Sequence, residues 1–219
     1  SISNAKIAAF KVAGLPYTIT ETKHIITYLS SNNTELKLFD EIIKVDGKDI
    51  SDLESIKKIV GAKEIGDKIT LEVLRNDSLL NVTSTIYEED GRKLIGVSLT
   101  NVNEVITEPK IDLKAKTNES GPSGGLMMAL SIYDAIASVD LTQGRKIIGT
   151  GTIDASGNVG AIGGVKYKLI GAVKNKANLF LVPKDNYEEA LEVAKEYNFT
   201  IKIVPVASLE EAIKELESE

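Results

Sequence analysis

The stretch Gly121-Pro122-Ser123-Gly124-Gly125 is followed directly by an apolar run at 126–136, the pattern of a tight turn opening into a buried helix. A serine at such a turn has an exposed hydroxyl, and the glycines let another carbonyl group approach the backbone closely. Free N–H groups at a helix start can also bind a developing negative charge on oxygen. Serine is equally a preferred helix N-cap. The stretch therefore leaves two interpretations of Ser123 open, a reactive hydroxyl and a cap.

Around this stretch the chain alternates strands and helices. We expect strands near 93–99, 110–116, 146–153, 179–182 and 200–204, and helices after Gly164, at 185–197 and from Ser208. Ser208 with Glu211 three residues later has the spacing of a capping box. Such alternation predicts an α/β domain.

A second Gly-rich turn brings two lysines to the start of a helix, in Ile162-Gly-Gly-Val-Lys-Tyr-Lys168. A lysine can act as a general base where burial disfavours its ammonium form, whereas most lysines at a helix start are simply solvated. The apolar face of this helix has Lys166 nearer its centre than Lys168; its members are Val165, Leu169, Ala172 and Val173. Periodicity alone does not choose Lys168.

The first part of the chain has a different sequence pattern, which predicts mostly β structure. Residues 1–14 predict a short helix, and 17–87 are mostly β, with one helix at 52–60 that Ser51 and Glu54 would cap. The charged, glycine-containing segment 88–92 is the best candidate for a linker. We therefore expect two domains, 1–90 and 91–219.

Composition excludes several classes of protein and site. The chain has 26 Lys and Arg against 32 Asp and Glu, a net charge of −6, and no basic cluster that would favour nucleic acid. Without cysteine, disulfides and thiolate chemistry are excluded. The only histidine, His24, lies in the first domain, so the second cannot build a Ser-His-Asp triad from its own residues. We expect no metal and no cofactor.

Neither an ATPase motif nor a membrane span is visible. Gly61-Ala-Lys-Glu-Ile-Gly66 has the glycine spacing of a phosphate-binding loop, but Asp67-Lys68 follows, so the lysine of that motif is misplaced. No apolar run reaches about 20 residues.

Four segments in order resemble the proteolytic domain of Lon-type proteases. Gly121–Gly125 resembles their G-P-S-A-G motif, Gly149-Thr-Gly-Thr-Ile153 their T-G-E-I, Ile162–Lys168 their I-G-G-L-K-E-K, and Leu181-Val-Pro-Lys-Asp-Asn186 their V-I-P-K-E-N. The resemblance implies Ser123 as nucleophile, Lys168 as general base and Thr150 as a supporting hydroxyl. Ser120, Gly124 and Thr152 depart from the residues usual in the family.

The first domain resembles a PDZ domain. Leu38-Phe-Asp-Glu-Ile-Ile-Lys-Val-Asp-Gly47 is similar to the L-x-x-G-D-x-I-x-x-V-D-G segment, with Phe39 where glycine is frequent. Strand addition would place a bound peptide between a strand at 24–29 and the helix at 52–60. The expected fold is a small PDZ-like β domain followed by a Lon-type proteolytic α/β domain.

The order PDZ then Lon-type domain, with no ATPase, is similar to a group of membrane-anchored bacterial proteases whose catalytic part lies outside the cytoplasm. The chain begins with Ser1 rather than Met. From this resemblance we expect the full-length protein to be held at the cell membrane by a segment absent here, and the present chain to be soluble.

The resemblance implies an ATP-independent serine endopeptidase that acts on unfolded or flexible protein and peptide substrates. Two alternatives stay open: an inactive protease-like scaffold that binds peptides, and a glycine-rich loop that binds phosphate at a helix N-terminus. The joint presence of Ser123, Thr150 and Lys168 favours the enzyme, because neither alternative needs all three.

Overall fold

The computed structural model describes residues 2–31, 35–111, 113 and 121–218, and these form two compact units. Unit 1 comprises Ser1–Thr20 and Glu104–Glu219, and unit 2 comprises Glu21–Asn103. The chain passes between the units within two strands, β1 (Tyr17–Leu29) and β8 (Val97–Thr107). Unit 2 is thus an insertion within unit 1 along the sequence.

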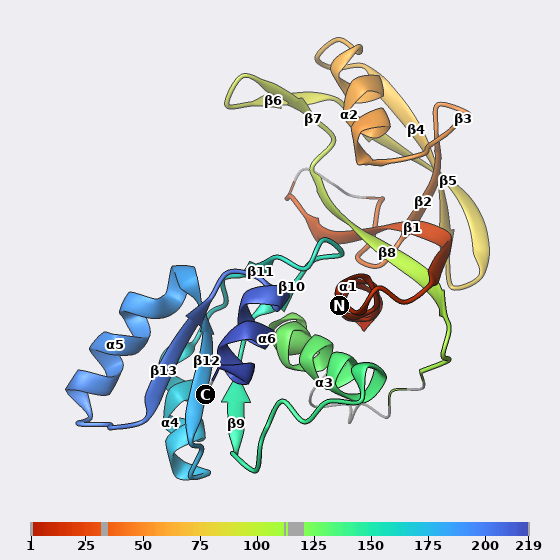
Figure 1. The fold of residues 1–219 in the computed structure, drawn as a ribbon. Helices are drawn as coiled ribbons and strands as arrows, with labels where there is room; N and C mark the ends of the chain where they lie inside the picture. The colour runs from red at the N-terminus through yellow and green to blue at the C-terminus, as the bar shows by residue number, and fades with distance from the viewer. Residues whose placement is uncertain (1, 32–34, 112, 114–120, 219) are drawn as a thin grey trace. The chain divides into compact units, whose positions relative to one another are not determined.

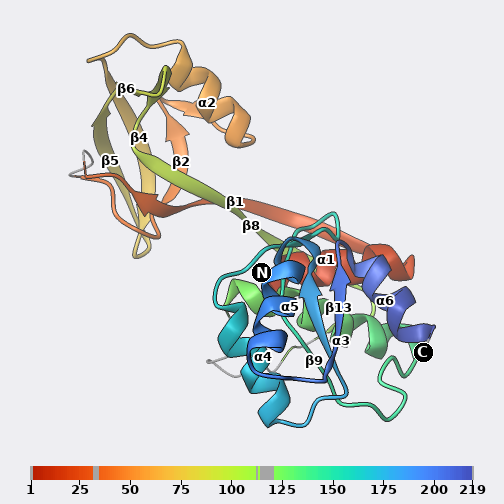
Figure 2. The same ribbon diagram turned by 90° about the vertical axis from the view of Figure 1, so that its left-hand side faces the viewer.

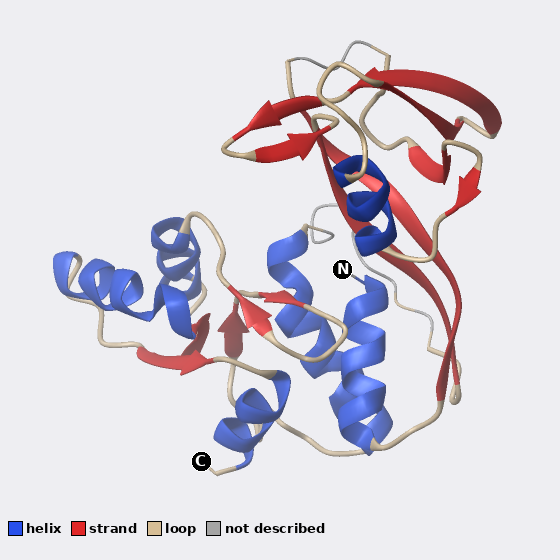
Figure 3. Ribbon diagram, turned by 90° about the horizontal axis from the view of Figure 1, so that it is seen from above, coloured by secondary structure: helices blue, strands red, loops and turns tan. Residues whose placement is uncertain are grey.

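This division differs from the expected domains, 1–90 and 91–219, in two ways: residues 91–103 belong to unit 2, and the N-terminal helix belongs to unit 1. Helix α1 (Ile2–Ala13) packs in the core of unit 1, where Phe10 is fully buried together with residues of α3 (Gly125–Ala137) and α6 (Leu209–Glu217). Figure 3 shows the helix marked N alongside α3. Its buried face carries alanines at positions 5, 8 and 9, which permit close helix packing but do not identify the partner.

The segment expected to be a linker is the turn of a hairpin. Strand β6 (Tyr87–Glu89) pairs antiparallel with β7 (Arg92–Leu94), and Asp90 and Gly91 form the two-residue connection. Both connecting residues have positive φ, +51° and +71°, as a type I′ turn requires. An Asp-Gly pair flanked by charged residues suits such a hairpin as well as it suits a linker.

Unit 1 is an α/β domain, as expected, with helices on both faces of its sheet. Its parallel sheet has the order β13–β12–β9, formed by Lys202–Val206, Leu179–Pro183 and Ile147–Gly149. Leu179 and Leu181 pack with α1, α3 and α6, while Phe180 and Val182 pack with α4 (Val165–Lys174) and α5 (Tyr187–Glu196). Figure 1 shows these helices on opposite faces of the sheet. A short hairpin, β10 (Thr152–Ile153) with β11 (Val159–Gly160), completes the unit.

Unit 2 is built on an antiparallel sheet in the order β5–β4–β2–β1–β8, with β3 (Lys48–Asp49) paired to β2 (Glu41–Val45). Helix α2 (Leu53–Gly61) packs on this sheet (Figure 2). Strand β4 (Lys68–Arg75) buries Ile69, Leu71 and Val73, the alternation expected of a half-buried strand. Its neighbour β5 (Ser78–Thr85) pairs with it along its full length.

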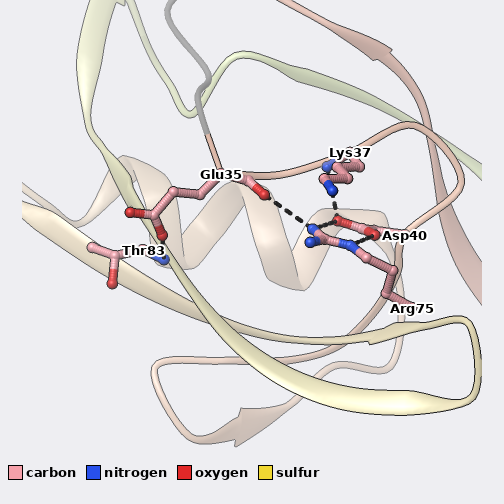
Figure 4. A network of polar contacts seen from close by, with 5 residues as sticks. All are labelled: Glu35, Lys37, Asp40, Arg75 and Thr83. Carbon is pink, nitrogen blue, oxygen red and sulfur yellow. Dashed lines mark hydrogen bonds and ion pairs between the residues drawn. The ribbon is translucent and has the colours of Figure 1, made fainter.

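A largely buried ion pair joins the loop before β2 to the end of β4. Arg75 donates from Nε to Asp40 Oδ1 over 2.7 Å and from Nη2 to Asp40 Oδ2 over 2.6 Å, and it also reaches the carbonyl of Glu35 (Figure 4). The Lys37 N–H donates to Asp40 as well, over 2.8 Å. Burial alone would raise the pKa of Asp40, but these hydrogen bonds outweigh burial and hold that pKa below its usual value.

Two of the predicted helix caps, those of α6 and α2, can be compared with the structure. Helix α6 has the expected N-cap, because Ser208 Oγ accepts from the Glu211 N–H over 3.1 Å. The expected capping box is only half formed, since the Glu211 carboxylate accepts from the Ala207 N–H, where a capping box would pair it with the N–H of Ser208. The prediction for α2 was wrong by one residue: Asp52 is the N-cap, in a capping box with Ser55.

Two of the expected strands also differ. The strand expected at 146–153 is divided into β9 and β10 at Thr150-Gly151, and much of the expected strand 110–116 lies outside the described residues. Among the described residues, no helix combines the length and apolar character needed to cross a membrane.

Candidate active site

Ser123 lies in a short 3-10 turn, η2 (Pro122–Gly124), that leads directly into α3. The N-cap residues here are Gly121 for the turn and Gly124 for the helix, and neither end has a side-chain cap. The hydroxyl of Ser123 therefore does not cap α3, and the interpretation of Ser123 as a helix cap is wrong. Gly125 is required for packing, since a Cβ there would lie 2.9 Å from both the backbone N and the Cγ2 of Ile153.

Thr150 follows β9 and is held from both sides. Its N–H donates to the carbonyl of Leu181 over 3.0 Å, and its Oγ1 donates to the carbonyl of Ser123 over 3.1 Å. The same Ser123 carbonyl accepts the Gly151 N–H over 2.8 Å. Thr150 is 2% exposed, so this hydroxyl fixes the backbone of the serine turn within the protein interior.

Lys168 comes from α4, one turn after Gly164, whose positive φ of +74° opens the helix. Its Nζ lies 2.7 Å from Ser123 Oγ and 3.3 Å from Thr150 Oγ1. The structure thus brings together all three residues that the sequence proposed, from three separate elements. A separation of 2.7 Å is within the range for proton transfer between a hydroxyl and an amine.

Lys166 points to a different neighbour. Its Nζ lies 3.2 Å from Glu196 Oε1 and 4.9 Å from the ring centre of Tyr197, both at the end of α5. Hydrogen bonding to Tyr197 and Glu196 raises the pKa of Lys166. A lysine that holds its proton more firmly is poorly suited to act as a base.

Ser123, Thr150 and Lys168 line a cleft of about 620 Å³ in unit 1. One face of α3 and one face of α4 line it, with β9 and Phe180 between them. The lining residues are Leu113, Gly121, Ser123, Gly124, Met127, Met128, Ser131, Ile148, Gly149, Thr150, Lys168, Gly171, Ala172, Asn175 and Phe180. Several of them were not singled out from the sequence, although on α4 they follow Lys168 at the i+3, i+4 and i+7 spacing of one helix face.

His24 is part of the framework of unit 2. It is 4% exposed on β1, and its Nδ1 lies 2.9 Å from Asn101 Oδ1 on β8. This hydrogen bond joins two neighbouring strands, which is a structural role.

Unit 2 has a smaller apolar groove of about 280 Å³ between α2 and the segment 93–99. Its lining residues are Leu53, Ile56, Lys57, Val60, Lys93, Leu94, Ile95, Val97, Ser98 and Leu99. The expected location, beside the strand at 24–29, was wrong, because β1 lies between β2 and β8 and has no open edge for strand addition. In the described sheet the edge strands are β5 and β8, and the groove lies beside β8.

Comparison with protein families identifies both units. Residues 110–218 match the Lon protease (S16) C-terminal proteolytic domain, and residues 25–86 match the PDZ domain. A PDZ domain of the SdrC-like protein from Listeria monocytogenes aligns over 37% of this chain and 92% of its own, with 16% identity and a TM-score of 0.34.

Curated relatives match less than half of the chain. A Lon protease of Azospirillum brasilense is 31% identical over 98 residues, which are 45% of this chain and 12% of that protein. A Lon protease of Mesomycoplasma hyopneumoniae is 34% identical over 88 residues, 40% of this chain and 10% of the relative. The chain thus spans only about a tenth of their length, and the homology supports a protease. On these matches, the chain combines a PDZ domain with a Lon-type proteolytic α/β domain.

Proposed function

We propose that this chain is an ATP-independent serine endopeptidase in which Ser123 is the nucleophile and Lys168 the general base. The observation that carries the proposal is the 2.7 Å contact between Lys168 Nζ and Ser123 Oγ at the wall of an open cleft. A peptide-binding scaffold would need the cleft but would have no use for a lysine directed at a serine hydroxyl.

In the acylation step, the neutral amine of Lys168 accepts the hydroxyl proton of Ser123 while Oγ attacks the scissile carbonyl carbon. The resulting ammonium then gives this proton to the leaving amine, so the C–N bond breaks and an acyl-enzyme remains. In deacylation the amine takes a proton from water, whose oxygen attacks the ester carbonyl carbon. The bond from that carbon to Ser123 Oγ then breaks, the ammonium returns its proton to Oγ, and the carboxylic acid product leaves.

Thr150 supports this cycle by orienting the lysine. Its only hydroxyl hydrogen is directed at the Ser123 carbonyl, so an oxygen lone pair is left to accept an N–H of Lys168. With one N–H held in this way, the lone pair of the neutral amine can face Ser123 Oγ. Thr150 is thus a positioning residue and does not itself transfer a proton.

The proposed substrates are unfolded or flexible proteins. The sequence has no phosphate-binding loop with the lysine in place, so this chain supplies no motor of its own to unfold a substrate. Exposed, flexible segments are the sites that proteases cleave without such a motor.

A casein digest with and without Mg-ATP tests the proposal, together with labelling by a serine-reactive peptidyl phosphonate. Wild type should cleave casein equally in both conditions and should be labelled, whereas Ser123→Ala should lose both cleavage and label while staying folded. Ser156→Ala is the matched control, since Ser156 is an exposed serine in a turn of the same unit. Undiminished proteolysis by Ser123→Ala would contradict the assignment.

We further propose that extended substrate segments bind along β8, beside α2. This is supported by the apolar groove there and by the position of β8 at the edge of the described sheet. Leu99→Asp, in the groove, should slow casein cleavage severalfold and leave short peptides unaffected. Val102→Asp, on the same strand but outside the groove lining, is the control. Equal losses on both substrates would exclude a role in protein capture.

A further inference from the structure

Gly171 lies in the middle of α4, one turn beyond Lys168, and lines the same cleft. Residues three apart on a helix have Cβ positions about 5–6 Å from one another. Gly171 is therefore next to the reacting groups, although the catalytic proposal gives it no part.

Nothing in the fold of the described residues requires glycine at this position. Its φ is not positive, so the backbone accepts any L-residue, and a Cβ built there would meet no atom within 4 Å. Glycine is also among the least favourable residues for a helix interior. The contrast with Gly125 is clear, since a side chain there would clash with Ile153.

Several walls of the cleft that Gly171 lines are apolar. Met127 comes from α3, Ile148 from β9 and Phe180 from β12, and Ala172 follows Gly171 on α4. When Ser123 Oγ attacks a carbonyl carbon, the side chains on either side of the scissile bond must lie within a few ångströms of the dyad. The free volume above Gly171 is within reach of one of them.

We propose that Gly171 sets the size limit of a subsite for a large apolar side chain flanking the scissile bond. This inference rests on the proposed function and adds to it the residue that selects substrates. The missing side chain leaves room for a ring or a branched chain of the substrate, at the expense of helix stability.

The test begins by mapping casein cuts made by the full chain with mass spectrometry. Two internally quenched fluorescent peptides are then made with the sequence around the strongest cut. They differ only at the position beside the scissile bond where the map shows large apolar residues, which is Phe in one peptide and Ala in the other. Gly171→Leu should lower the ratio of kcat/KM for the Phe peptide over the Ala peptide at least tenfold. Gly171→Ala should lower it about threefold and, because alanine favours a helix, raise Tm by about 2–4 °C.

The control is Gly61→Ala at the end of α2, another helical glycine with nothing within 4 Å of a built Cβ. It should leave the peptide ratio unchanged. If wild type neither cuts casein nor reacts with the phosphonate, the proposed function fails and this inference fails with it. A second outcome overturns only the role of Gly171: wild type is active, and a folded, active Gly171→Leu keeps the wild-type peptide ratio. If Gly171→Leu does not fold, Gly171→Ala serves as the variant for this comparison.

Discussion

The Nζ atom of Lys168 lies 2.7 Å from the Oγ atom of Ser123, although 45 residues separate them in the chain. Each residue follows a glycine-rich turn at the start of a helical segment, so the backbone holds both side chains at element ends. Lys166, two residues earlier on the same helix, is engaged by Glu196 and Tyr197. The two lysines thus form a natural pair for testing which one is the base.

Lys168→Arg should reduce kcat/KM by at least about a thousandfold, because a guanidinium stays protonated and cannot accept the proton of Ser123. Lys166→Arg should stay within about threefold of wild type, since arginine can keep the contacts with Glu196 and Tyr197. Hydrolysis of a short peptide, measured with purified variants of equal Tm, checks both. Loss of activity in Lys166→Arg with Lys168→Arg spared would move the base by two residues.

Thr150→Val should lower kcat by about 10- to 100-fold while changing KM little, because valine keeps the volume but cannot accept an N–H of Lys168. Thr150→Ser keeps the hydroxyl and should recover most of kcat. The readout is the separate determination of kcat and KM on one peptide. If serine fails to rescue, the methyl group and not the hydroxyl is what matters at this position, and the positioning role is refuted.

Much of the architecture could be predicted from the sequence because burial leaves a periodic pattern. Ile69, Leu71 and Val73 are buried at alternate positions along β4, and the strand expected at 179–182 is found as β12. The site residues came from the resemblance to Lon-type motifs and not from periodicity. The helical wheel of α4 placed Lys166 nearer the centre of the apolar face than Lys168. A helical wheel contains no information about Glu196, which lies 30 residues away in sequence on α5 and binds Lys166.

Other features could not be predicted because the same short sequence pattern is compatible with two different structures. The alanines of α1 indicate a buried helix but not the unit that buries it, and Phe10 proves to lie in the core of unit 1. The Asp90-Gly91 pair is typical of both a linker and a type I′ hairpin. The predicted location of the peptide groove was wrong because β1 pairs with β8. The two strands are more than 70 residues apart in sequence at Thr27 and Ser98, and this pairing cannot be inferred from either strand alone.

Asp40→Asn should destabilise unit 2 by about 3 kcal/mol at pH 7, because Arg75 would lose the carboxylate that balances its charge in a largely buried pair. The folded-state pKa of Asp40 lies below the value of about 3.9 for an unfolded chain. The stabilisation is therefore complete above about pH 4 and is lost as the pH falls through the folded pKa. Hydrogen exchange of β2 and β4 amides, compared between wild type and variant at each pH, measures the difference.

The control for this pair is Asp49→Asn, since Asp49 is 89% exposed and lies 3.6 Å from Lys44. Exposed pairs of this kind contribute about 0–1 kcal/mol, so the variant should exchange like wild type at pH 7 and at pH 3. A destabilisation by Asp40→Asn that persisted undiminished once the pH had fallen below the folded pKa of Asp40 would show that packing and not charge is responsible.

Phe39→Gly should stabilise unit 2 by about 1 kcal/mol. Phe39 has a φ of +70°, a conformation in which a side chain is strained, and its ring is 76% exposed, so little burial is lost on removing it. Its N–H donates to the carbonyl of Ile26 over 2.9 Å, a bond that glycine keeps. Asn76→Gly is the comparison, because Asn76 also has positive φ but asparagine tolerates it better, so the gain there should be a few tenths of a kcal/mol. Hydrogen exchange of the amides in β2 measures both, and slower exchange in Phe39→Gly than in wild type is the expected result. Faster exchange would mean that the Phe39 ring contributes packing that outweighs the strain of its backbone.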